Sequence, residues 1–256
     1  MSDLRRPEDA LEAIVEAVDL HRKLAADRPP IFNADLAGSL HNLSNRLSDL
    51  GRRDDALEAI VEAVDHYWQL SADRHPVFNV DLARSLNNLS NRLLDLGRQE
   101  DALGAIVEAV DLRRQLAAER PVAFNAGLAL SLNDLSVCLF HTGRLEDALR
   151  AIIETVDLRR PLAAEHPAMF TVDLACSLGN LSQYLSDLRC REDSLQSIKE
   201  AVGLFRRAAA DCPAAFNALL AQSLDCLSHR LSDLGRREDA LDAQREAKGI
   251  CQQFTN

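Results

Sequence analysis

Apolar residues follow helical spacing along the chain. Between about Asn79 and Leu96, leucines recur at steps of three and four, which places them on one helix face. From about Gln99 to Glu119 the apolar positions form a broader stripe with the same helical spacing. No segment keeps the period-two alternation of a half-buried strand. The pattern therefore predicts an all-α protein.

The helical pattern repeats every 46 residues. Residues 6–51 and 52–97 are identical at 33 of 46 positions. A phenylalanine marks each period, at Phe32, Phe78, Phe124, Phe170 and Phe216. Self-similarity of this kind is typical of arrays in which each repeat packs only on its neighbours.

Each period contains two helices, helix A and helix B. Gly97 follows a helix A, where a left-handed residue commonly ends a helix. Helix B is expected to end at Arg120, because the residue before Pro121 is disfavoured in the helical region. Phe124 and Asn125 are then expected to precede and cap the next helix A.

The period resembles the tetratricopeptide repeat. The matching residues are Leu40-x2-Leu43-Ser44-x2-Leu47, then Gly51, Ala56-x3-Ile60 and Ala63. Its length is similar to that of the long repeats in kinesin light chains and in fungal and bacterial signalling proteins. The resemblance implies a right-handed α-solenoid of about 11 antiparallel helices. We expect a single array over 1–256, with an unpaired helix B over 7–27 and helix pairs over 31–73, 77–119, 123–165, 169–211 and 215–254.

The unpaired helix over 7–27 carries an apolar stripe that we expect to be exposed: Leu11, Ile14, Val15 and Val18. Three explanations stay open at this point. The chain is a piece of a longer array, the helix forms a homodimer contact, or the terminal helix is frayed.

The resemblance implies that ligands bind the concave groove lined by helix A. The expected peptide-binding residues are His41, Asn42, Asn45, Asn87, Asn88, Asn91, Asn133, Asn180 and Gln183. An amide offers donors and an acceptor, so it can pair with both polar groups of a peptide backbone. In the alternative interpretation, the amides recur because the repeats were copied, and they bond neighbouring helices to one another.

The net charge of −11 favours a partner with some Lys or Arg and disfavours a nucleic-acid backbone. Aspartates recur near the end of helix A, at Asp49, Asp95, Asp187 and Asp233. They either form an acidic track for a basic peptide or pair with arginines three residues earlier. The chain also lacks a run of about 18 apolar residues and an apolar leader, so we expect a cytoplasmic protein without a membrane span.

The sequence offers no catalytic, metal-binding or cofactor motif, since its His and Cys residues follow no ligand spacing. We therefore predict a non-catalytic scaffold that binds a peptide or protein segment in the groove. One alternative is the sensor or regulatory arm of a larger nucleotide-binding signalling protein. The other is an enzyme or small-molecule receptor, for which a closed pocket with clustered ionisable groups would be needed.

Overall fold

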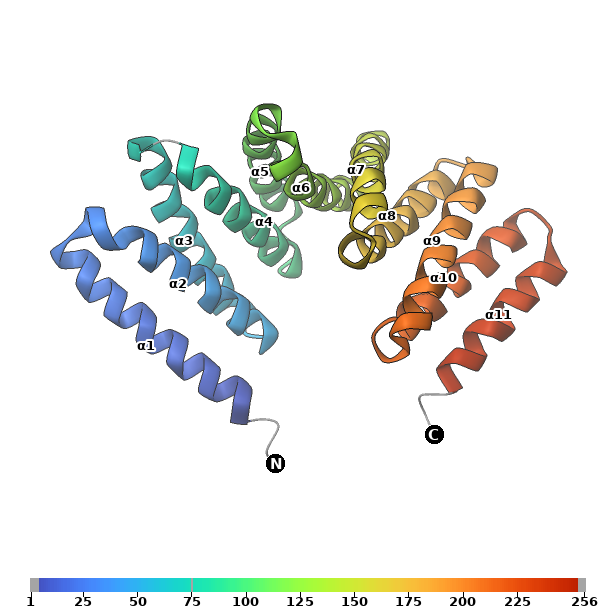
Figure 1. Ribbon diagram of the computed structural model, residues 1–256, viewed down its shortest axis with the longest axis horizontal. Helices are drawn as coiled ribbons and strands as arrows, with labels where there is room; N and C mark the ends of the chain where they lie inside the picture. Colours follow the sequence, from blue (N-terminus) through green and yellow to red (C-terminus); the bar gives the residue numbers. More distant parts are fainter. Residues whose placement is uncertain (1–4, 75, 253–256) are drawn as a thin grey trace. The chain divides into compact units, whose positions relative to one another are not determined.

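The computed structural model describes residues 5–74 and 76–252 of the chain (Figure 1). Within these residues the chain forms helices and no strand, which confirms the all-α prediction. The chain divides into two compact units, Met1–Thr142 and Gly143–Asn256.

Both units consist of long helices that pack on their neighbours in chain order. In the first unit the helices are α1 (Arg5–Asp27), α2 (Pro29–Asp49), α3 (Arg53–Arg74), α4 (Asn79–Asp95), α5 (Gln99–Glu119) and α6 (Pro121–His141), with a short 3-10 turn η1 (Pro76–Phe78) before α4. In the second unit they are α7 (Leu145–Glu165), α8 (Pro167–Asp187), α9 (Arg191–Asp211), α10 (Pro213–Asp233) and α11 (Arg237–Gln252). The even-numbered helices are A helices and the odd-numbered ones are B helices. The predicted pair 123–165 spans the division, so its two helices belong to different units.

Most B helices are preceded by an arginine that lies three residues before an aspartate of the first turn. Arg98 Nε donates to Asp101 Oδ2 at 2.8 Å, and the Arg98 carbonyl accepts the first helical bond of α5, from Ala102. The aspartate lies in the first turn, where a negative charge complements the helix dipole. This local signal helps to set the starts of α3, α5, α7 and α11; α9 has Cys190 in place of the arginine.

The A helices end as predicted, on a left-handed residue. Gly97 has φ of 74°, and Arg98 N donates to Leu93 O at 2.8 Å. These are the φ value and hydrogen bond of a Schellman motif. In the second unit Arg189 takes this position with φ of 64°, a conformation that costs a non-glycine residue about 1–2 kcal/mol.

The prediction that Phe124 and Asn125 precede and cap a helix is wrong. Both lie inside α6, which starts at Pro121. Proline suits the first helical position, because its ring presets φ and its missing N–H has no helical partner there. The same occurs at α2, α8 and α10, so these A helices start two residues earlier than predicted.

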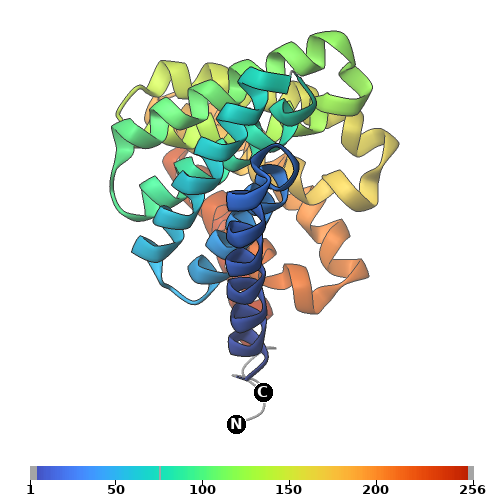
Figure 2. The ribbon, with the colours of Figure 1, turned by 90° about the vertical axis from the view of Figure 1, so that its left-hand side faces the viewer.

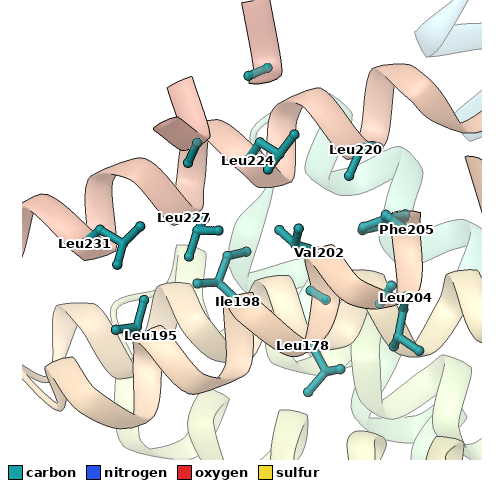
Figure 3. Close-up of a cluster of buried hydrophobic side chains, with 14 of the residues drawn as sticks. Leu178, Leu195, Ile198, Val202, Leu204, Phe205, Leu220, Leu224, Leu227 and Leu231 are labelled. Atoms are coloured by element: carbon teal, nitrogen blue, oxygen red, sulfur yellow. The ribbon is translucent and has the colours of Figure 1, made fainter. Parts of the chain in front are cut away.

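Small residues let the two helices of a pair approach closely. The Ser44 hydroxyl donates to the Ala56 carbonyl at 2.7 Å, and Ser90 donates to Ala102 at 2.9 Å. All four residues are fully buried. Larger apolar side chains fill the space around the crossings. In Figure 3, leucines of α10 face Ile198, Val202 and Phe205 of α9 in the second unit.

Helix α1 packs along α2 in the first unit (Figures 1 and 2). Val18 is only 2% exposed and packs against Leu36 and Leu40, so the prediction of an exposed stripe is wrong for Val18. Leu11 and Ile14 are half-buried. Val15 and Leu20 are exposed and lie on the open face of α1, where the predicted homodimer would form. The dimer stays a prediction.

Helix α6 is long and apolar enough, by length and composition, to cross a membrane, and it is the single such helix in the described residues. This property of α6 was not predicted from the sequence. One helix of this kind is weak evidence, because core helices pass the same test. In the structure α6 packs on α5 and α4, and its Asp134 accepts a hydrogen bond from Asn87 of α4.

Candidate functional site

The predicted binding residues lie on A helices, in both units. His41, Asn42 and Asn45 belong to α2, and the remaining predicted residues belong to α4, α6 and α8. Their exposure differs sharply. His41 is 5% and Asn87 is 3% exposed, whereas Asn42 is exposed. The half-buried residues are Asn45, Asn88, Asn91, Asn133, Asn180 and Gln183.

His41 bridges α2 to α4. Its Nδ1 lies 3.0 Å from Ser85 Oγ, and its Nε2 lies 3.2 Å from the Nδ2 of Asn88. Asn88 also donates to Asn45 Oδ1 at 2.8 Å. An amide nitrogen can only donate, so Nε2 accepts and Nδ1 carries the proton that is donated to Ser85. The sequence motif thus forms a closed polar cluster between two A helices.

His41 is held neutral in this cluster. Burial removes the ring from water and lowers its pKa to about 4, and the nearby charges of Arg84 and Arg92 act in the same direction. A protonated ring would also turn Nε2 into a donor facing the Asn88 donor. His41 therefore supports the helix contact only in its neutral form.

Asn87 makes the equivalent bridge from α4 to α6. Its Oδ1 accepts a hydrogen bond from Ser131 Oγ at 2.6 Å, and its Nδ2 donates to Asp134 Oδ2 at 2.8 Å. Like His41, Asn87 contacts a serine and the residue three positions after it on the next A helix. These two residues have the inter-helix role that the sequence analysis left as the alternative. Peptide binding by the other amides stays a prediction.

The second unit has no such bridge between α8 and α10. Gly179 stands at the position of His41 and Asn87, and a Cβ added to it would meet nothing within 4 Å. A cavity of about 320 Å³ lies at this place. We call it the α8–α10 pocket; its lining includes Cys176, Gly179, Asn180, Gln183, Phe205, Leu219, Ser223 and Cys226. Sequence reasoning missed the pocket, although Gly179 breaks the repeat and was the signal for it.

Gln183, which lines the pocket, is held by three hydrogen bonds. Its Nε2 donates to both oxygens of Asp187, at 3.0 and 3.2 Å, and its Oε1 accepts a bond of 2.7 Å from Arg230. Both ends of this amide are therefore used within the unit. Of the recurring aspartates, Asp187 pairs with an amide because Tyr184 stands where other repeats have arginine.

The other recurring aspartates form local ion pairs. Arg46 lies 3.2 Å from Asp49, Arg92 lies 3.3 Å from Asp95, and Arg230 lies 3.7 Å from Asp233. The pairing interpretation is confirmed for these three. Because the aspartates are exposed, each pair contributes no more than about 1 kcal/mol.

Side-chain contacts also connect successive B helices, and they were not predicted from the sequence. An arginine of one B helix forms an ion pair with the glutamate that lies 40 residues later, on the next B helix. These pairs are Arg22 with Glu62, Arg160 with Glu200, and Arg206 with Glu246. Trp68 replaces the arginine once, and its Nε1 donates to Glu108 at 2.7 Å. The signal was present in the 46-residue period, since both partners recur with it.

The described residues contain no group of three His, Cys, Asp or Glu side chains that could hold a metal ion. The recurring serines Ser44, Ser90, Ser136 and Ser182 are at most 1% exposed. What the A-helix surface offers is amide donors and acceptors in both units and an apolar pocket in the second.

The family model described as "Tetratricopeptide repeat" matches residues 36–76, 82–119, 128–168 and 220–253, more than half of the chain. The crystal structure of BtubC (BKLC) from P. vanneervenii is 17% identical with a TM-score of 0.78, covering 98% of this chain and 92% of that one. A putative kinesin light chain with nearly identical TPR-like repeats from Podosopora anserina is 17% identical with a TM-score of 0.67, covering 87% and 97%. MamA from Desulfovibrio magneticus RS-1 is 15% identical with a TM-score of 0.57, covering 85% and 96%. At these identities the likeness shows the fold, and no curated protein sequence matches the chain.

Proposed function

Because the chain belongs to the tetratricopeptide repeat family, whose arrays typically mediate protein–protein interactions, we propose that it is a non-catalytic scaffold that binds an extended peptide on the surface of its A helices. No observation on this chain favours the alternative of a regulatory arm of a nucleotide-binding protein. The proposed binding residues all lie on A helices.

Unused amides carry the proposal. Asn42, Asn91 and Asn180 make no side-chain hydrogen bond to any residue that the structure describes. Asn45 uses its oxygen to accept from Asn88, and its Nδ2 donates to no residue that the structure describes. Side chains with free donors and acceptors on A helices can pair with the N–H and C=O groups of a peptide backbone. Each bond would contribute about 0.5–1.5 kcal/mol.

Charge supports a basic partner. The chain carries a net charge of −11, and Asp49, Asp95 and Asp233 keep about half or more of their side-chain surface exposed even within their ion pairs. A peptide with lysines or arginines would be attracted to such a surface, more strongly at low salt.

The test uses peptides selected on the wild-type chain from a random 12-residue phage-display library. The triple variant Asn42→Ala, Asn91→Ala and Asn180→Ala removes the available amides of both units, and it is expected to bind each selected peptide at least about twofold more weakly, because at least one bond of this size is lost in whichever unit the peptide contacts. Fluorescence anisotropy with labelled peptide gives both dissociation constants.

The matched control removes three exposed amides from B helices instead: Gln69→Ala, Gln115→Ala and Gln196→Ala. It is expected to keep wild-type affinity. Equal affinity of the wild type and the A-helix triple variant would contradict the proposal, as would a loss of binding in the control.

A further inference from the structure

We propose that the α8–α10 pocket takes one apolar side chain of the bound peptide, while Asn180 and Ser223 in the pocket lining pair with the peptide backbone. This inference rests on the proposed function. It assigns the second unit a specificity site, whereas the equivalent place in the first unit is closed.

The pocket exists because one bridging side chain is missing. In the first unit, His41 reaches Ser85 and Asn87 reaches Ser131 on the next A helix. In the second unit the residue at this position is Gly179, and the serine opposite is Ser223. A glycine has no side chain to span the gap, so the space between the two helices stays open.

Ser223 also lacks the B-helix partner that the corresponding serine has in other repeats. His21 of α1 lies 2.8 Å from Ser39, and Arg159 of α7 donates to Ser177. The corresponding B-helix residue of α9 is Phe205, which is buried and apolar. Ser223 therefore has neither partner. Its hydroxyl makes no hydrogen bond to the part of the chain that the structure describes.

The pocket is lined by both apolar and polar residues, which suits an apolar side chain of a peptide together with its polar backbone. Its apolar lining residues include the buried Ile198 and Phe205, and its polar lining residues include the half-buried Asn180 and Ser223. A volume of about 320 Å³ would otherwise hold roughly ten waters, at about 30 Å³ each, against these apolar side chains. An apolar group that displaces the waters gains the hydrophobic contribution, while Asn180 and Ser223 pair with the peptide backbone.

Negative charges near the pocket favour certain residues on either side of the apolar peptide residue. Asp173 is exposed and lies one helical turn before Cys176, a lining residue, and Asp225 is exposed next to Cys226. Basic residues on either side of the apolar one would complement these carboxylates. The occupant is thus an apolar residue of a peptide with flanking Lys or Arg.

The variant Gly179→Asn tests the pocket, because the chain itself shows that Asn at this position bridges to the serine opposite. We expect peptides selected on the wild type to share an apolar residue and to bind Gly179→Asn at least about tenfold more weakly. Gly179→Ala, which fills little of the space, is expected to change the affinity less than about threefold.

Two further variants separate the pocket from general effects. Gly203→Asn makes the same exchange in α9, where an added Cβ also meets nothing within 4 Å but which lies outside the pocket lining; it is expected to bind like the wild type. Replacing the shared apolar residue of the peptide by Ser is expected to weaken wild-type binding and to have no further effect on Gly179→Asn. Circular dichroism confirms that each variant is folded.

Peptides that need the A-helix amides but bind Gly179→Asn normally would overturn the pocket inference and leave the proposed function intact. Selected peptides without a shared apolar residue would overturn it as well. If no selected peptide depends on the A-helix amides, the proposed function and the pocket inference both fail.

Discussion

Lowering the pH from 7 to 4 is expected to reduce the free energy of unfolding by up to about 3 kcal/mol through His41 alone. The pKa of this residue falls from 6.5 in the unfolded chain to about 4 in the folded one. Between these values the unfolded state binds a proton that the folded state does not. The contribution is therefore present in full above pH 6.5 and is lost as the pH falls toward 4.

The variant His41→Asn isolates this effect. Asn87 shows that an amide at this position can bridge to the serine of the next A helix. The variant should therefore stay folded while lacking the titrating ring. Urea unfolding at several pH values is expected to give a smaller loss of stability below pH 6.5 than in the wild type. Parallel pH profiles for the two proteins would contradict the burial and neutral state of His41.

Replacing Asn87 by Ala is expected to destabilise the chain by about 2–3 kcal/mol. The substitution leaves the fully buried Ser131 hydroxyl without its acceptor and removes the hydrogen bond that Asn87 donates to Asp134 Oδ2. Buried polar groups that lose their partners cost their full desolvation free energy.

The matched substitution is Asn180→Ala. Asn180 is half-buried and makes no hydrogen bond to the described residues, so the change is expected to stay within about 0.5 kcal/mol. Chemical denaturation of both variants compares an inter-helix amide with an available one. Similar losses at the two positions would refute the division of roles between them.

The helices themselves were largely predictable from the sequence, because their signals are local. Most B helices start at Arg-x-x-Asp segments, and the A helices end at left-handed residues such as Gly97. The prolines misled the prediction, since Pro121 was taken as a stop before a cap, whereas it is the first residue of α6. A proline that follows one helix and a proline that starts the next helix have the same local sequence. Only the packing of the next helix distinguishes these two possibilities.

The roles of the amides could not be predicted in the same way. Asn87 and Asn180 are one position apart in the repeat, and both were expected in the groove. Asn87 is buried and hydrogen-bonded, whereas Asn180 is half-buried and makes no hydrogen bond to the described residues. The difference depends on which residue of the next A helix lies opposite, some 46 residues away. Helical periodicity fixes the face of one helix and does not give the register between two.

The measurement that tests the central claim most directly is the alkylation rate of each cysteine with and without a selected peptide. Cys176 and Cys226 line the α8–α10 pocket, while Cys190, Cys212 and Cys251 are exposed and outside its lining. When the peptide concentration is ten times the dissociation constant, the fraction of protein without bound peptide falls about tenfold. The account therefore predicts that iodoacetamide modifies the two pocket thiols about tenfold more slowly and the other three thiols at unchanged rates. Unchanged rates at Cys176 and Cys226, or protection confined to the other three, would contradict it.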